Sequence, residues 1–499
     1  MNSIWLGYGF AAPIGPRRRF LALWWGCFLL IVGGLAFAIF SVQTLPLVDY
    51  PNHLARMVII ADGGKSPMLA HYYGLEWRAL PNLAMDLIVP PLGLLIGVEL
   101  AMKVFVLTAL ILLGGGTIIL HRYLWQRDSL WSLLGFEFIL GRSLLWGFLN
   151  FLFAAGLAMV VFALWLQWRE SRPRLALVIL AVGAIGVYFS HFVAFGILAS
   201  LIGVVYIMDC WRLRHWSWIG FLAIAGAFIL PLSLFILTYF LNPNQSASAV
   251  SAIEFGNYFR KFDLPFALFK SYNLWLDSVT AIVLVGFLAF GLMRNRLQLS
   301  AMMVAPLVLM IVLYFLMPES ILTATLVDQR LPLFIALVVA AGSLPNLVEA
   351  RYAAVCLVGF ALLFGLRLTI LTSVWHGQDE QLQEARQLLS SLPVGAKIVA
   401  QIDDSDLGIR TDHPPFDHLV TLAVIERQAL VPRLFVNPSQ QPLRYRQAAP
   451  SYRQATPKIN SADYVLVLST SPWSLPQTNR PSQRIGYAMG GILSLYRLK

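Results

Sequence analysis

Charged residues are scarce in this sequence. Asp, Glu, Lys and Arg fill 12% of its 499 positions, whereas 58% of the residues are hydrophobic. Water-soluble globular proteins have about a quarter of their residues charged, so this composition excludes that class and predicts a chain that lies mostly in lipid. Cysteine is also rare. Cys27, Cys210 and Cys356 all lie in or beside apolar runs, which excludes a disulfide framework or a zinc motif built on cysteine.

The positive charge has a pattern that fits membrane topology. A net charge of +11 would suggest nucleic-acid binding in a soluble protein. Here the basic residues occupy every second connection between apolar runs, in PRRRF at 16–20, HRYLWQR at 121–127, WRESRPR at 168–174, WRLRH at 211–215 and RNR at 294–296. Lys and Arg near helix ends are retained on the cytoplasmic side. We therefore predict no nucleic-acid partner, a cytoplasmic N-terminus and an extracytoplasmic C-terminal domain.

About eleven apolar runs have roughly the twenty residues that a helix needs to cross a bilayer. We predict spans near 20–42, 97–120, 129–144, 147–167, 173–190, 192–210, 217–240, 275–293, 299–317, 331–348 and 353–373. The first is too long for a cleaved signal peptide and lacks a small-residue cleavage site, so it is predicted to be an anchor. The expected fold class is an α-helical polytopic membrane protein, and the expected location is the bacterial inner (plasma) membrane.

The character of the sequence changes near residue 375. We assign residues 1–375 to a transmembrane domain, with a long first outer segment at 43–97, and residues 376–499 to a small extracytoplasmic α/β domain. The signals for that domain are a helix end, a Pro-Gly turn and a strand in LLSSLPVGAKIVAQ (388–401), a β-prone run in ADYVLVLST (462–470) and a closing strand in GGILSLYRL (490–498).

One stretch of this outer domain offers candidate metal ligands. DHPPFDH at 412–418 contains Asp412, His413, Asp417 and His418. The two prolines and the absence of a known ligand spacing favour a solvated loop instead. We predict no metal site here.

Ionisable side chains in or beside lipid are costly and mark functional sites by default. The first outer segment is amphipathic without a clear span, so we expect short helices along the interface that roof a cavity. Later outer turns carry further polar residues and are expected to converge on the same leaflet. The candidate site residues are Asp49, His53, Arg56, Glu76, Arg78 and Asp86 in the first outer segment, and Arg142, Asn150, His191, Asp328 and Arg330 in the later turns.

Structural roles compete with functional ones at these positions. Asp49 lies just ahead of a proline suited to a first helical turn, so it can serve as a helix cap. Arg142 can snorkel to lipid headgroups, His191 can cap a helix end, and Asp328 can pair with Arg330.

Two further pairs of charges lie within predicted spans. Glu99 and Lys103 are four residues apart on one helix face and are expected to pair. Glu137 and Arg367 are isolated in apolar runs. They either line a polar path or pair with each other across helices.

Together these features resemble the GT-C superfamily of polyprenyl-phosphate-sugar glycosyltransferases. The resemblance rests on an acidic residue in a long first outer loop, many spans, basic groups in later outer loops and an outer α/β domain preceded by LPVGAKIV. It covers nearly the whole chain, and at the residue level it is confined to VDYP at 48–51. The chain has Asp49 and Tyr50 where the protein mannosyltransferase and aminoarabinose transferase branches carry an Asp-Glu pair, which leaves the acceptor and the subfamily open.

The resemblance implies transfer of a sugar from a polyprenyl-phosphate donor to an extracytoplasmic glycan, lipid or protein acceptor, by a single displacement with inversion. Asp49 would be the base, because a partly desolvated carboxylate has a raised pKa suited to proton abstraction near neutral pH. Arg330, Arg142 and His191 would neutralise the departing phosphate. No cofactor is implied, and a divalent metal is compatible with the chemistry but not indicated.

Other functions would use the same charges. A transporter or flippase for lipid-linked saccharides would line its route with them, but the span pattern shows no inverted repeat and the charges gather on one side. A polysaccharide polymerase or ligase shares the lipid-linked donor and differs mainly in its acceptor. An adaptor whose outer domain binds a partner is the remaining alternative, because a fold resemblance does not by itself establish activity.

Overall fold

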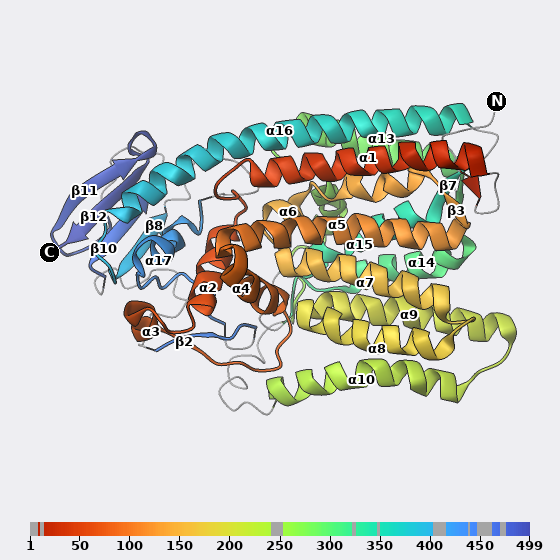
Figure 1. Cartoon of the computed structure of the whole chain (residues 1–499), viewed down its shortest axis with the longest axis horizontal. Helices are drawn as coiled ribbons and strands as arrows, with labels where there is room; N and C mark the ends of the chain where they lie inside the picture. The colour runs from red at the N-terminus through yellow and green to blue at the C-terminus, as the bar shows by residue number, and fades with distance from the viewer. Residues whose placement is uncertain are drawn as a thin grey trace.

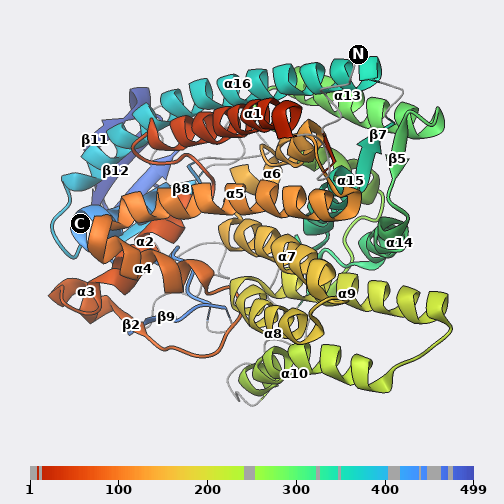
Figure 2. The same cartoon turned by 45° about the vertical axis from the view of Figure 1, so that its right-hand side comes forward.

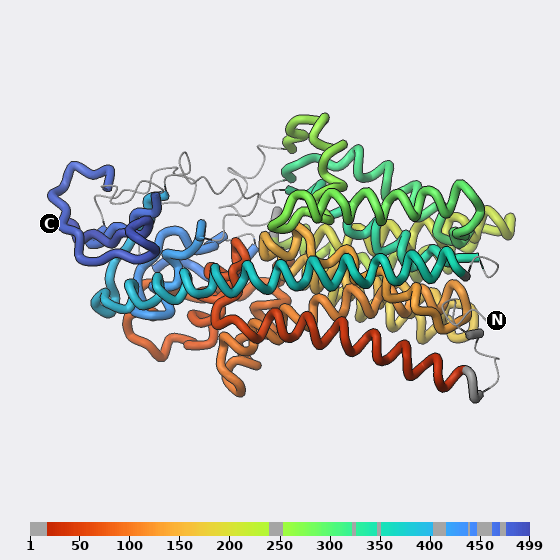
Figure 3. Tube along the Cα trace, turned by 90° about the horizontal axis from the view of Figure 1, so that it is seen from above, coloured from red at the N-terminus to blue at the C-terminus, as the bar shows by residue number. Residues whose placement is uncertain are grey.

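The structure, a computed structural model, describes residues 8–9, 14–240, 253–321, 326–346, 350–402, 416–437, 440–446, 462–469 and 476–499. A bundle of long helices continues at one end into a smaller region that holds a four-stranded sheet (Figure 1). The N-terminal end of the first long helix lies at the opposite end of the bundle from that sheet (Figure 1, Figure 3).

Eight helices of the described residues are long and apolar enough to cross a membrane, which makes this chain a membrane protein. They are α1 (Ile14–Phe40), α5 (Val98–Trp125), α7 (Leu149–Trp168), α8 (Pro173–Ser190), α9 (Phe192–Leu213), α10 (Trp218–Phe240), α13 (Leu274–Met293) and α16 (Ala350–Ser390). The spans predicted at 299–317 and 331–348 correspond to the shorter helices α14 (Ala301–Leu316) and α15 (Leu331–Gly342). Membrane crossing by these two shorter helices stays a prediction.

The segment 129–144 does not form the predicted membrane-spanning helix, so that prediction is wrong. It folds as a 3₁₀-helix, η2 (Leu130–Phe138), followed by the short α6 (Arg142–Leu145). Irregular backbone inside a membrane bundle needs partners for its carbonyl groups. Arg367 of α16 supplies them. Its guanidinium donates hydrogen bonds of 3.0–3.2 Å to the carbonyls of Glu137, Leu140 and Phe269.

Neighbouring basic stretches lie together at one end of the bundle. Asp128 forms ion pairs with Arg17 (3.0 Å) and Arg122 (2.8 Å), which joins the N-terminal end of α1 to the C-terminal end of α5. Arg169, after α7, pairs with Asp209 of α9. Four of the five basic stretches therefore lie in two neighbouring pairs, and the side of the membrane on which they lie stays a prediction.

The first outer segment contains short elements, as expected. These are α2 (Tyr50–Asp62), α3 (Pro67–Tyr72), β2 (Tyr73–Leu75) and α4 (Ala84–Ile96). Later short helices are α12 (Arg260–Asp263), η3 (Leu264–Leu268), η4 (Asp328–Arg330), η6 (Leu419–Thr421), α17 (Leu422–Arg427) and η8 (Met489–Gly491). Four two-stranded pairs are β1–β3 (Tyr8–Gly9, Arg127–Asp128), β2–β9 (Leu443–Tyr445), β4–β6 (Ile253–Glu254, Ser320–Ile321) and β5–β7 (Leu297–Leu299, Ser343–Pro345).

The four-stranded sheet confirms the predicted α/β character of the tail. Its strands are β8 (Ile398–Ile402), β10 (Tyr464–Leu468), β11 (Ser482–Ala488) and β12 (Leu493–Leu498), in the order β11-β12-β10-β8. β10 pairs in parallel with β8 and antiparallel with β12. Successive residues of a strand face opposite sides, so the side chains of β10 alternate between two clusters. Leu466 and Leu468 join the larger cluster of the sheet-containing region, and Val465 and Val467 join a smaller one. We call the sheet-containing region the outer region and its larger cluster the outer core.

Helix α2 lies between the two main cores. Its Leu54 and Met57 belong to the core of the helix bundle, while its Ala55 and Ile59 belong to the core of the outer region. Both apolar faces of this helix are therefore buried. The residue at its N-terminus is held where the bundle meets the outer region.

Helix α16 joins these two parts of the molecule. Its 41 residues span about 60 Å, roughly twice the thickness of the hydrocarbon layer. It runs beside α1 along the bundle and continues to the sheet (Figure 1, Figure 2). A single helix thus links the membrane bundle to the outer core.

Candidate active site

Asp49 is fixed by backbone contacts between two loops. Its N–H donates to the Trp146 carbonyl (3.2 Å), and the preceding Val48 N–H donates to the Leu145 carbonyl (2.9 Å). Gly147 permits this approach, because its φ is +80° and a Cβ there would lie 3.2 Å from the Asp49 Cβ. The loop after α6 therefore packs directly on the residue predicted to be the base.

The Asp49 side chain does not cap α2. Asp49 occupies the N-cap position ahead of Pro51, yet its carboxylate accepts no capping hydrogen bond. Its Oδ1 instead lies 3.4 Å from Nε2 of His418. Burial raises the pKa of Asp49 and outweighs the lowering effect of the His418 contact, while the charge of Asp417 raises it further and that of Arg56 lowers it. A raised pKa suits a general base that works near neutral pH.

His418 reaches Asp49 from the outer region, where it immediately precedes η6 and is 3% exposed. Its Nε2 also lies 3.5 Å from Oδ2 of Asp417, whose Oδ1 accepts a hydrogen bond of 2.6 Å from Arg433. Its Nδ1 lies 3.3 Å from Nδ2 of Asn52 in α2. The Asn52 amide also donates to the Arg433 carbonyl (2.9 Å) and accepts from the Phe435 N–H (2.8 Å). Asn52 thus joins α2 to the stretch of the C-terminal region that runs from His418 to Phe435.

His53 and Arg56 lie on the turns of α2 that follow Asp49. The His53 ring packs against Phe435, and burial lowers its pKa well below the ordinary value, with the charges of Arg56 and His418 acting in the same direction. Arg56 does not face the candidate site. It forms a fully buried ion pair with Asp86 of α4, with Nε–Oδ1 2.9 Å and a hydrogen bond from Nη2 to Oδ2 of 3.1 Å. These two predicted site residues join α2 to α4.

A second group of predicted residues gathers around the Phe151 ring of α7. The Arg330 guanidinium lies 5.1 Å from the centroid of the Phe148 ring and 5.8 Å from that of Phe151. His191, between α8 and α9, meets the Phe151 ring edge-on at 5.3 Å. Two of the outer turns that were expected to converge therefore meet on one phenylalanine.

Arg330 lies within electrostatic reach of Asp49. Burial lowers the pKa of Arg330 to about 10, and the charges of Asp328 and Asp49 raise it. Asp328 forms an ion pair with Lys261 of α12, Oδ2–Nζ 3.6 Å. Lys261 is buried and also donates to two backbone carbonyls, those of Tyr314 (3.0 Å) and Met317 (2.5 Å). This lysine braces the loop that carries Asp328 and Arg330.

The remaining predicted residues take other positions. Arg142, the first residue of α6, lies over the ring of Trp146, 5.2 Å from its centroid. Asn150 of α7 accepts from the Met85 N–H (2.9 Å) and donates to the Asn82 carbonyl (2.6 Å), so it fixes the start of α4. Glu76 and Arg78 form an exposed ion pair, and Glu76 also pairs with Arg444 of β9. Among the described residues, the structure shows no direct contact of these four side chains with the Asp49 carboxylate.

The prediction of a solvated loop at DHPPFDH is wrong for His418, which is buried against Asp49. Asp412 and His413 lie outside the described residues. A signal for this burial was present in the apolar run LVTLAVI at 419–425, which directly follows His418. The sequence around Lys261 contains no comparable signal that this lysine is buried. Within the described ranges, no group of three or more His, Cys, Asp or Glu side chains is arranged to hold a metal ion.

No protein-family model and no curated protein matches this sequence. Two solved structures are similar in fold. ArnT from Cupriavidus metallidurans bound to undecaprenyl phosphate shares 14% identity at a TM-score of 0.53, over 94% of this chain and 98% of that chain. The apo state of ArnT from that organism shares 13% identity at a TM-score of 0.52, over 96% and 98%. This chain has a GT-C-like fold. The resemblance drawn from the sequence is thereby confirmed for the fold.

Proposed function

We propose that this protein is an integral membrane glycosyltransferase that moves a sugar from a polyprenyl-phosphate donor to an extracytoplasmic glycan, lipid or protein acceptor, with inversion. The observation that carries the proposal is the partly buried, uncapped carboxylate of Asp49, which lies 3.4 Å from His418 and within electrostatic reach of Arg330. The GT-C-like fold supports it, because one solved neighbour binds undecaprenyl phosphate. We place the protein in the bacterial inner membrane with Asp49 on the outer side.

In this reaction Asp49 is the general base. The acceptor oxygen attacks the anomeric carbon from the face opposite the phosphate, and its proton passes to the Asp49 carboxylate. The bond between the anomeric carbon and the phosphate oxygen breaks, and its electron pair leaves with the polyprenyl phosphate. One displacement inverts the anomeric centre. The raised pKa of Asp49 brings its basicity closer to that needed for this proton transfer.

Arg330 stabilises the charge that develops on the leaving phosphate. The Arg330 guanidinium lies over Phe148 and Phe151 and within electrostatic reach of Asp49, and planar N–H pairs match phosphate oxygens. Lys261 is a poorer candidate, since its donors are used on two carbonyls and on Asp328. His191, on the same Phe151 ring, is the neighbouring group that contacts the phosphate or the sugar.

The test is a transfer assay with Asp49→Asn. Mass spectrometry of cell-envelope glycans with and without the protein first identifies the sugar. The purified protein in lipid nanodiscs is then given undecaprenyl phosphate carrying that sugar. We expect the variant to bind undecaprenyl phosphate like the wild type while transfer falls about a hundredfold or more, because Asn is nearly isosteric but cannot accept the proton.

Asp86→Asn is not a suitable control, because it would break the buried ion pair with Arg56. Asp62→Asn is better, since Asp62 lies at the far end of the same helix. It should transfer at the wild-type rate. Near-normal turnover by Asp49→Asn would remove Asp49 from the mechanism. Movement of the labelled donor across sealed vesicles without release of undecaprenyl phosphate would favour a transporter instead.

A further inference from the structure

The hydrogen bonds of Asn52 determine which nitrogen of His418 carries the proton. The Asn52 Oδ1 accepts from the backbone N–H of Phe435 at 2.8 Å, so the amide cannot be reversed without placing two donors together. Its Nδ2 therefore faces the Arg433 carbonyl at 2.9 Å and His418 Nδ1 at 3.3 Å. One N–H of Nδ2 points to the Arg433 carbonyl, and the other points to His418 Nδ1. His418 Nδ1 is thus an acceptor.

A neutral imidazole that accepts at Nδ1 carries its proton on Nε2. That N–H faces two carboxylates, Asp49 Oδ1 at 3.4 Å and Asp417 Oδ2 at 3.5 Å. Arg433 already holds the Asp417 carboxylate through its other oxygen at 2.6 Å. In the described part of the chain, the polar side-chain contact shown for the Asp49 carboxylate is the one with His418 Nε2 at 3.4 Å. His418 is therefore the group that sets the orientation of Asp49.

We propose that His418 is a positioning residue of the transfer reaction: its Nε2–H, fixed in that tautomer by Asn52, holds the Asp49 carboxylate away from the end of α2 and toward the acceptor. This inference rests on the proposed function. Asp49 has helical backbone angles (φ −87°, ψ −6°), the Tyr50 N–H donates to the Leu47 carbonyl (3.0 Å) and Pro51 has no N–H. The start of α2 therefore makes little demand on the carboxylate as a cap. The contact with His418 then determines where the carboxylate points.

The fold holds this histidine firmly. His418 is followed by the buried residues of η6 and α17, which pack in the outer core with Ala55 and Ile59 of α2. The His418 carbonyl accepts from both the N–H (3.0 Å) and the hydroxyl (2.6 Å) of Thr421. The outer region thereby supplies a part of the site that the membrane helices do not provide.

Two substitutions of His418 separate positioning from packing. In His418→Gln, the longer side chain carries a donor N–H about where Nε2 lies and reaches Asp49. In His418→Asn, the shorter amide keeps an acceptor for Asn52 but cannot reach Asp49. We expect the Asn variant to lose about tenfold or more in kcat, with little change in KM for the donor, because a misplaced reacting group costs on that order. We expect the Gln variant to recover most of the rate.

The pH profile gives a second readout. The titratable and charged groups that act on Asp49 are His418 and Asp417 from the C-terminal region, Arg56 from α2 and Arg330 from η4. The base works when ionised, so kcat rises with pH through the pKa of Asp49. His418 lowers that pKa, and its loss should move the rising limb of the Asn variant to higher pH. The Gln variant should keep the limb near its wild-type position.

Equal kcat and equal pH limbs for the two variants would overturn the proposal, and so would wild-type behaviour of His418→Asn. Nitrogen NMR of the wild-type protein in liposomes covers the case in which the variants do not fold, because a proton found on Nδ1 of His418 would also exclude the proposed contact. The proposed function is judged separately. Inactive Asp49→Asn with unaffected His418 variants would keep the glycosyltransferase and discard the positioning role.

Discussion

Buried arginines serve two different purposes in this chain. Arg56 directs its guanidinium to the Asp86 carboxylate, and Arg367 directs its own to three backbone carbonyls, so both hold the fold together. Arg330 instead stacks on two phenylalanine rings and lies within reach of the Asp49 charge. Arginine type and burial alone do not distinguish these residues. The position of Arg330 near the Asp49 charge does, and it is the reason for proposing Arg330 as the phosphate ligand.

Arg330→Lys tests that assignment. Lysine keeps the positive charge but loses the planar guanidinium that lies over Phe148 and, with it, the proposed two-bond contact with phosphate oxygens. We expect binding of undecaprenyl phosphate to weaken tenfold or more, given about 1.5 to 3 kcal/mol for a charge-assisted contact. A binding titration in nanodiscs measures it. The matched control is Arg78→Lys, in an exposed pair with Glu76, which should bind like the wild type. Equal affinity of the two variants would leave the phosphate without its proposed ligand.

The sequence selects Asp49, His191 and Arg330 as candidates because each is a polar residue at a predicted outer turn of an apolar chain, and their roles stay predictions. The same criterion selects Arg56, which has a buried partner of its own in α4. The criterion does not select His418, because its proposed role depends on a contact between the first outer loop and the tail. A local sequence pattern does not reveal that contact.

At the scale of elements, apolar runs predict burial better than they predict the type of secondary structure. The long helices lie close to the predicted spans, and β8, β10 and β12 lie in the predicted strand stretches. The run at 129–144 is as apolar as a span but forms η2 and α6. Its backbone is stabilised by Arg367 from α16, far along the chain. An apolar run of this composition can therefore fold either as a helix or as a buried irregular segment. The irregular form needs a distant side chain that donates hydrogen bonds to its backbone carbonyls.

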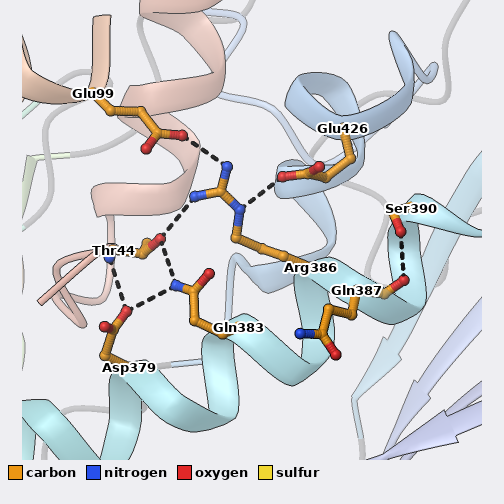
Figure 4. Close-up of polar contacts among 8 residues, drawn as sticks. All are labelled: Thr44, Glu99, Asp379, Gln383, Arg386, Gln387, Ser390 and Glu426. Atoms are coloured by element: carbon orange, nitrogen blue, oxygen red, sulfur yellow. Dashed lines mark hydrogen bonds and ion pairs between the residues drawn. The ribbon is translucent and has the colours of Figure 1, made fainter.

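Arg386 of α16 holds four elements together (Figure 4). Its Nη2 contacts Glu99 of α5 (2.7 Å), its Nε contacts Glu426 of α17 (2.7 Å), and its Nη1 donates to Oγ1 of Thr44 (3.0 Å). Glu99 therefore forms its ion pair with Arg386 and not with the predicted Lys103, whose Nζ donates to a backbone carbonyl. The loop that leads to Asp49 and the helix that follows His418 are thus tied to one guanidinium.

Arg386→Met should destabilise the protein. The change removes three hydrogen bonds and leaves Glu99 and Glu426 close together without their shared cation. We expect the free energy of unfolding to fall by about 1 to 3 kcal/mol, seen as a lower thermal midpoint in detergent. Gln387→Met is the control, since Gln387 is the next residue of the same helix and is exposed. If both variants melt at the same temperature, the network around Arg386 has no net effect on stability.

At the scale of the whole molecule, the candidate site lies at the junction of two cores, and this location explains its chemistry. The helix bundle supplies Arg330, His191 and the loop that packs on Asp49, while the outer region supplies His418. A lipid-linked donor can approach such a junction from the bilayer, and a polar acceptor can approach it from outside. The proposed base and the proposed phosphate ligand therefore lie where the helix bundle meets the sheet-containing region.

This arrangement requires the outer sheet and the basic connections to lie on opposite sides of the membrane. The sheet and the N-terminal end of α1 are at opposite ends of the bundle, and Lys and Arg near helix ends are retained in the cytoplasm (Figure 1). In a background without native cysteines, Gln483→Cys on the exposed face of β11 should react with a membrane-impermeant thiol reagent in intact cells. Gln298→Cys, exposed on β5 beside the RNR connection, should react only after permeabilisation. Gln298 is preferred to Asn295, whose φ of +52° disfavours cysteine. Reversed labelling would put Asp49 in the cytoplasm, where the proposed extracytoplasmic transfer could not take place.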